Sequence, residues 1–133
     1  MPRRLILWLP VVTLMAAIFA VSSMSSPPSP PGVSDKSLHW ITYLALAVLT
    51  ARALADGRWT AVTLRLAAAA WLIATLYGAT DEWHQRFTPE RHADWYDLAA
   101  DALGAAAGAG AAWAWGIIKR FGGRPARRPR PHP

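Results

Sequence analysis

Three polar residues share one face of a helix near residue 40. Lys36, His39 and Tyr43 are spaced i, i+3 and i+7, and Asp35 lies one turn before the histidine. An imidazole exchanges protons near neutral pH, and a neighbouring carboxylate can fix its tautomer, while a lysine can neutralise a carboxylate of another helix. The same spacing fits a helix cap, with Ser34 as the N-cap residue and the lysine in solvent. Both interpretations stay open at this stage.

A second polar group follows in the segment DEWHQRFTPERHADWYD. Asp81, Glu82 and Gln85 fall within one turn of a helix that Pro89 would end. Arg91 comes directly after this turn and adds a cation. The segment therefore places acidic, amide and basic side chains close together at a helix end.

A third group begins the last apolar segment. Asp97, Asp101, Gly104 and Gly108 are spaced i, i+4, i+7 and i+11, so the carboxylates share a face with glycines that permit close approach of another helix. We expect the second of these carboxylates to point inward. Its expected partners are Lys36, His39 and Arg91.

The composition predicts that membrane helices position these groups. Of the 133 residues, 53% are hydrophobic and only 17% are charged, and the charges are bunched between long apolar segments. Because crossing about 30 Å of hydrocarbon takes roughly 20 apolar residues, we expect an all-α membrane protein with four transmembrane helices. The expected helices are about 5–23, 35–55, 61–80 and 97–118. They form a membrane domain over residues 1–118, followed by a basic, proline-rich, disordered tail over 119–133.

The distribution of basic residues predicts the orientation. Eleven of the fourteen Lys and Arg residues lie at the N-terminus, near the 54–60 connection or in the tail. The positive-inside rule then places both termini in the cytoplasm and the regions 22–34 and 81–96 outside. Residues 5–23 also fit a cleavable signal peptide, which leaves the orientation unchanged. We expect the first helix to be peripheral and assign no chemistry to the Ser- and Pro-rich loop that follows it.

Several classes of site are set aside. With no cysteine there is no thiolate nucleophile and no cysteine-ligated metal. No HExxH, GxSxG or glycine-rich phosphate motif is present, and His39, His84 and His92 lie in separate segments, so we expect neither a metal site nor a cofactor. The basic tail is interpreted as an orientation signal attracted to anionic lipid rather than as a nucleic-acid ligand.

Taken together, the first two groups resemble the VanZ-like family of small bacterial membrane proteins. The family motif DKxxHxxxY is present as DKSLHWITY, and DEWHQRFTPER resembles DExxQxFxPxR, followed by Asp97 and a small-residue helix. The resemblance covers residues 34–108. Glu90 stands where the family often has glycine, so we expect this turn to differ, and Asp101 stands where asparagine is more frequent.

The resemblance implies a multi-pass protein of the bacterial cytoplasmic membrane and cell envelope. The family is named for an accessory teicoplanin-resistance protein, so at least one relative is linked to low-level lipoglycopeptide resistance. The resemblance supplies neither a substrate nor a mechanism, and the oligomeric state stays open.

Two functions are carried forward. One is an enzyme or binding protein for an envelope lipid or lipid-linked cell-wall precursor, with Glu82 or Asp101 as general base and His39 as acid or base. Lys36 and Arg91 would bind an anionic head group. The other residues expected around the substrate are Asp35, Tyr43, Asp81, Gln85 and Asp97. The alternative is a non-catalytic scaffold whose polar groups only clamp the helices.

Overall fold

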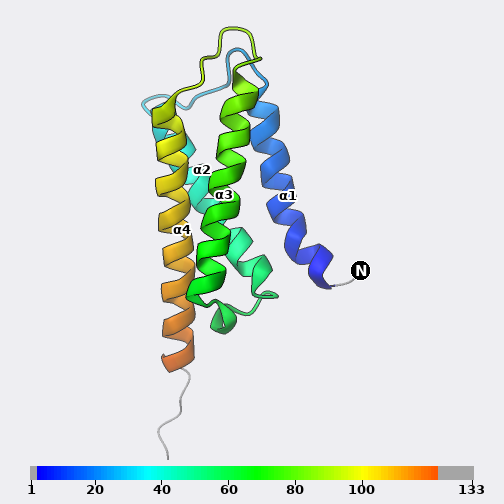
Figure 1. Cartoon of the computed structure of the whole chain (residues 1–133), viewed down its shortest axis with the longest axis vertical. Coiled ribbons are helices and arrows are strands. Elements are labelled where there is room, and N and C mark those ends of the chain that lie inside the picture. Colours follow the sequence, from blue (N-terminus) through cyan, green and yellow to red (C-terminus); the bar gives the residue numbers. More distant parts are fainter. Residues whose placement is uncertain (1–2, 123–133) are drawn as a thin grey trace, which may run out of the picture.

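Residues 3–122 are described by a computed structural model, and within this range the chain is entirely helical (Figure 1). The helices run alternately up and down, so α1 begins and α4 ends at the same end of the bundle. The elements are α1 (Arg3–Ser22), α2 (Asp35–Leu54), the 3-10 helix η1 (Trp59–Ala61), α3 (Leu64–Gln85) and α4 (Trp95–Gly122). We call the end with connections 23–34 and 86–94 the loop end, and the opposite end the terminal end.

The third helix is displaced along the chain relative to the prediction. It runs from Leu64 to Gln85 rather than over 61–80, because Thr63 caps it by accepting a hydrogen bond from the Leu66 N–H. The acidic pair that opens the second polar segment is therefore part of α3, as the spacing of Asp81, Glu82 and Gln85 predicted.

The last helix is longer than predicted. It continues to Gly122, so residues 119–122 are helical although they were assigned to the disordered tail. The Arg120 guanidinium fixes this last turn by donating to the carbonyl oxygens of Gly116 and Val62. Residues 123–133 of the predicted tail lie outside the described residues.

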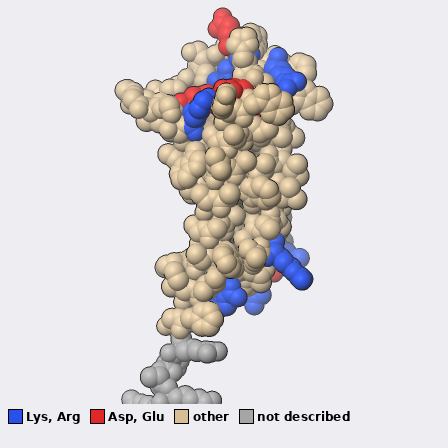
Figure 2. All heavy atoms as spheres, turned by 60° about the vertical axis from the view of Figure 1, so that its left-hand side comes forward, with Lys and Arg blue, Asp and Glu red and all other residues tan. Residues whose placement is uncertain are grey.

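By length and composition, α1 and α2 qualify as membrane spans, with mean hydropathies of 2.4 and 1.3. This supports two of the four predicted spans. In the view of Figure 2, acidic and basic side chains gather at the two ends of the bundle and leave the middle uncharged.

The closest helix packing joins α2 to α4, which share the largest interface. A methyl group on Gly104 or Gly108 would overlap the backbone carbonyl oxygens of Trp40 and Leu44, respectively. The small-residue stripe is thus in direct contact with another main chain, as predicted. This contact sets the height and rotation of α4 beside α2.

Candidate functional site

Lys36 joins α2 to the start of α4. Its Nζ donates at 2.9 Å both to Asp94 Oδ2 and to Asp97 Oδ1. The Asp94 carboxylate also accepts from the Tyr96 N–H, and this bond together with the lysine lowers the pKa of Asp94. Ser34 meanwhile caps α2 through the Ser37 N–H. Both features considered from the sequence are therefore present: Ser34 is a helix cap, and Lys36 pairs with carboxylates outside its own helix.

His39 pairs with the carboxylate that is fully buried between helices. Its Nδ1 lies 2.8 Å from Asp101 Oδ1, and Asp101 is 0% exposed. The other carboxylate oxygen packs against Gly78 of α3, where an added Cβ would lie 2.9 Å from Oδ2. Asp101 therefore points inward, as predicted, and finds one of its expected partners.

Asp35 does not hold the His39 imidazole, so this role, one of the two interpretations left open, is wrong. It forms no hydrogen bond or ion pair with any described residue and is exposed at the start of α2, so Asp101 rather than Asp35 orients the imidazole. Tyr43, one turn below His39, is buried with its ring parallel to the imidazole at 6.5 Å between centroids.

Glu82 connects α3 to the loop before α4. Its Oε2 accepts a hydrogen bond of 3.0 Å from the Asp94 N–H, whereas its Oε1 is buried and has no partner among the described residues. Asp94, which the sequence reasoning did not single out, thus contacts two site residues. Its signal was available, because Asp is a favoured residue immediately before a helix.

The first helix reaches the site, so the expectation that it is peripheral is wrong at the loop end. Ser22 Oγ donates to Asp81 Oδ2 at 2.7 Å, and Gln85 Nε2 donates to the same oxygen at 3.1 Å. Gln85 Oε1 in turn accepts from Arg91 Nη2 at 2.8 Å. A continuous hydrogen-bonded chain therefore runs from α1 through α3 to the loop.

His84 contacts α1 and its end rather than the chain of hydrogen bonds from Ser22 to Arg91. Its ring stacks on Phe19 with 4.5 Å between centroids, and its Nε2 lies 2.9 Å from Ser23 Oγ. The histidine therefore contributes to the contact between α1 and α3.

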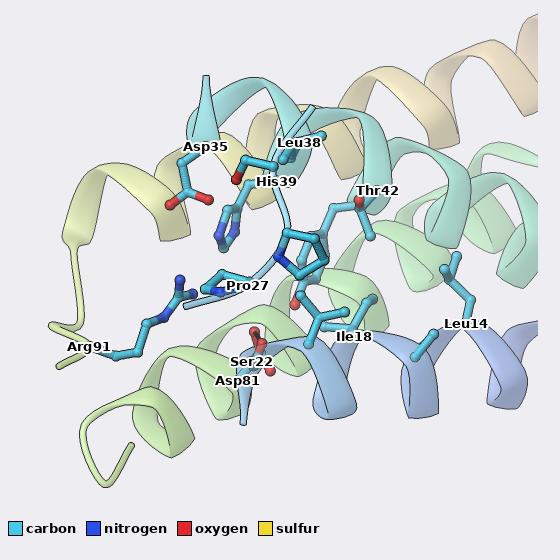
Figure 3. Close-up of a pocket in the computed structure, with 15 residues that line it drawn as sticks. Leu14, Ile18, Ser22, Pro27, Asp35, Leu38, His39, Thr42, Asp81 and Arg91 are labelled. Atoms are coloured by element: carbon cyan, nitrogen blue, oxygen red, sulfur yellow. Dashed lines mark hydrogen bonds between the residues drawn. The ribbon is translucent and has the colours of Figure 1, made fainter. Parts of the chain in front are cut away.

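A cavity of about 230 Å³ opens beside the polar groups. Figure 3 shows Asp35, His39 and Arg91 directed into it from one end, with apolar residues of α1 along another wall. Pro27, Pro28 and Ser29 also line it, so the 23–34 loop, to which no chemistry was assigned, forms part of the wall. The apolar side chains contributed by α1 are Leu14, Ala17, Ile18 and Val21.

A second hollow, of about 360 Å³, lies between α3 and α4. It is lined by Glu82 and by two tryptophans, Trp83 and Trp95, that are 64% and 77% exposed. His39 and Glu82 thus face different hollows, with the buried Asp101 between the helices that carry them.

The loop end has an excess of acidic groups. Its basic side chains, Lys36, Arg86 and Arg91, are outnumbered by the carboxylates. These are Asp35, Asp81, Glu82, Glu90, Asp94, Asp97 and Asp101.

The comparison with protein families identifies the chain. A model of the family described as VanZ/LLP1 matches residues 4–118. The chain belongs to the VanZ/LLP1 family. The match confirms the resemblance seen at residues 34–108 and extends it over α1 and most of α4. No curated protein and no solved structure matches the chain.

In this VanZ/LLP1 protein the turn before Arg91 has a conformation that suits glycine. Glu90 has a φ of 63°. The left-handed region costs a residue with a side chain about 1–2 kcal/mol. Glu90 therefore adds backbone strain next to Arg91.

Proposed function

We propose that this VanZ/LLP1 protein crosses the bacterial cytoplasmic membrane four times, with both termini in the cytoplasm and the loop end outside. The concentration of basic residues at the terminal end supports this orientation. Crossing of the membrane by α3 and α4 is supported by large apolar side chains that project outward from these two helices. They include Leu72 and Leu76 of α3 and Leu103 and Ile118 of α4, each at least 50% exposed.

Fusions to a phosphatase that is active only outside the cytoplasm test this topology. A fusion after Arg91 is expected to be active and a fusion after Arg124 inactive. The reverse pattern would overturn the orientation, and activity at both positions would overturn the number of spans.

The site is proposed to bind an anionic amphiphile, such as an envelope lipid or a lipid-linked cell-wall precursor. The observation that carries this proposal is the cavity with an apolar α1 wall and Arg91 at its polar end. Lys36 is already neutralised by Asp94 and Asp97, whereas Arg91 bonds Gln85 and pairs with no carboxylate of residues 3–122. The arginine is therefore the cation available to a head group.

The cavity size limits what can enter it. At about 230 Å³ it is smaller than the roughly 300–1,000 Å³ of drug-sized sites. It accommodates part of a lipid, a head group or the upper part of one chain, while the remainder stays in the bilayer.

Any proton transfer at this site is assigned to His39 in the metal-free protein. Of the three residues proposed from sequence to be catalytic, only His39 lines the cavity, because Asp101 is fully buried and Glu82 faces the other hollow. A general acid or base must reach its substrate. Asp101 is therefore proposed to position the imidazole, and Glu82 to organise the loop through Asp94.

A structural clamp is the second candidate function. It is favoured by Lys36, which ties α2 to α4, and by the hydrogen-bonded chain from Ser22 to Arg91, which ties α1 to the loop. On this alternative the same groups only hold the helix ends together.

The Arg91→Gln variant separates the two functions. Purified protein in lipid nanodiscs would be compared by native mass spectrometry for retained phosphatidylglycerol, undecaprenyl phosphate and zwitterionic phosphatidylcholine. We expect a loss of about tenfold in retention of the two anionic lipids, since one charge-assisted hydrogen bond contributes roughly 1.5–3 kcal/mol. Arg58→Gln, an exposed arginine at the terminal end, is the matched control. Unchanged retention with a lowered unfolding temperature would favour the clamp.

A further inference from the structure

Three helices bring potential metal ligands together beneath the loop end. His39 of α2, Glu82 of α3 and Asp101 of α4 each offer one ligand atom, and these atoms lie within 4.8 Å of one another. One imidazole and two carboxylates form a donor set that binds divalent metals in proteins. No single segment carries the set, which is why the sequence did not predict it.

Two carboxylates of this group have buried oxygens without partners. Glu82 Oε1 and Asp101 Oδ2 form no hydrogen bond with any of residues 3–122, and the two residues are 6% and 0% exposed. A buried, unpaired anionic oxygen is unfavourable by several kcal/mol unless a cation or a proton compensates it. The arrangement therefore calls for positive charge at this position.

Of the described cationic groups, only His39 bonds one of these two carboxylates, and it bonds Asp101 Oδ1, which leaves Asp101 Oδ2 and Glu82 Oε1 uncompensated. Lys36 is bonded to Asp94 and Asp97, and the Arg91 guanidinium is bonded to Gln85. The buried Tyr43 hydroxyl offers a single donor, whereas Asp81 adds a third unpartnered carboxylate oxygen to those of Glu82 and Asp101. At most one of the three oxygens can be satisfied in that way.

We propose that His39, Glu82 and Asp101 bind a divalent transition-metal-type cation, Zn²⁺ or Mn²⁺. Zinc binds nitrogen and oxygen ligands at about 2.0–2.2 Å, which places tetrahedral ligand atoms roughly 3.4 Å apart. Side-chain movements on the order of 1 Å therefore close the site. Three protein ligands leave a coordination position for water or for an anionic ligand, and the cation offsets the acidic excess of the loop end.

A second group of possible metal ligands, which includes the same histidine, is less suitable as a metal site. Asp35, His39 and Asp97 also have ligand atoms within 4.8 Å of one another. However, Asp97 Oδ1 already accepts from Lys36, and Asp35 is exposed to solvent. The buried grouping is therefore preferred.

Metal titration of the full chain in detergent micelles tests the proposal, which stands independently of lipid binding. After treatment with a chelator, the parent is expected to bind one Zn²⁺ or Mn²⁺ per chain in equilibrium dialysis with elemental analysis. Glu82→Gln and His39→Gln are each expected to weaken binding at least tenfold. The matched controls Glu90→Gln and His84→Asn, which alter the same residue types away from the site, should bind like the parent.

A spectroscopic measurement on the parent alone keeps the test decisive if the variants do not fold. Co²⁺ added to the stripped protein should give the intense visible absorption of a low-coordinate site, which added Zn²⁺ then abolishes. The proposal is overturned if the parent binds substantially less than one ion per chain, or if the control variants lose binding as much as Glu82→Gln. Lipid retention by Arg91→Gln is a separate readout, so either proposal can fail alone.

Discussion

The two ends of the bundle hold their helices together in different ways. At the terminal end the one acidic residue, Asp56, forms an exposed ion pair of 3.3 Å with Arg4 and accepts a bond from Arg3 at its backbone oxygen. At the loop end, four acidic side chains are buried. They are Asp81, Glu82, Asp97 and Asp101.

This difference distinguishes the contacts that are enough to close a helix bundle from the buried carboxylates that this protein has in addition. At the terminal end, exposed arginines bond backbone carbonyl oxygens. The exposed ion pair between Arg4 and Asp56 contributes at most about 1 kcal/mol to stability. Burying carboxylates is costly, so a bundle that needed only closure would not use several of them. The additional buried charge supports the proposal that a ligand binds at the loop end.

The largest effect is expected from a methyl group at the α2–α4 contact. In Gly104→Ala the new Cβ would overlap the Trp40 backbone, which cannot rotate away, so the helices must separate beside His39. We expect a loss of about 1–3 kcal/mol, measured as the unfolding midpoint in detergent. Gly116→Ala, at the terminal end, meets the Trp59 oxygen at 2.7 Å and should cost less. Gly110→Ala has no neighbour within 4 Å, and equal midpoints for it and Gly104→Ala would contradict this packing.

The next largest effect is expected when the polar contacts of α1 are removed, with a larger loss of stability at the loop end than at the terminal end. Ser22→Ala removes a buried bond to Asp81 and should lower the free energy of unfolding by about 1.5–3 kcal/mol, since the acceptor is a buried carboxylate. Arg4→Ala removes only the exposed pair with Asp56 and should cost less than about 1 kcal/mol. Chemical unfolding curves measure both. Similar losses would mean that the two ends do not differ energetically.

A stabilising change is expected at the strained turn of the loop end. Glu90→Gly relieves left-handed backbone strain of about 1–2 kcal/mol in the folded state. The glycine also makes the unfolded chain more flexible, which offsets roughly 0.4–1 kcal/mol of this gain. The net increase in the free energy of unfolding is therefore roughly 0.5–1 kcal/mol. Asp56→Gly, with a φ of 51° at the terminal end, should gain less, because Asp tolerates this region better. Thermal midpoints of both variants decide this, and a destabilised Glu90→Gly would show that the side chain has a compensating contact.

The smallest effect is a response of the loop end to acid. The pKa of Asp94 is lowered in the folded state, so its contribution to stability is fully present above the ordinary carboxyl pKa of about 3.9 and is lost as the pH falls through the lower folded value. Tryptophan fluorescence during acid titration should therefore show a transition below about pH 4 that Asp94→Asn removes. A transition retained in this variant would assign it to another carboxyl group.

The convergence of the site could be predicted because helical periodicity fixes which residues share a face. The spacing placed Lys36 and His39 on one face of α2, and Asp97 and Asp101 on one face of α4, and these faces meet in the structure. The resemblance to the family supplied the link between segments that periodicity alone cannot join.

The sequence left both Asp35 and Asp101 as possible partners of the imidazole, because the choice depends on the height at which two helices meet. Asp35 is one turn from His39 along its own helix, yet Gly104 and Gly78 bring Asp101 closer across the interface. Ser22 was missed for a different reason, since a serine at the end of an apolar helix has no distinguishing pattern until a carboxylate is seen beside it.

The glycine contacts of α4 have a consequence for how the protein can vary. Gly104 and Gly108 meet main-chain atoms of α2, so no rotamer takes part in the contact that sets the distance between His39 and Asp101. In the proposed topology, the outward-facing apolar residues of both helices can therefore be exchanged to match bilayers of different thickness while the site keeps its dimensions.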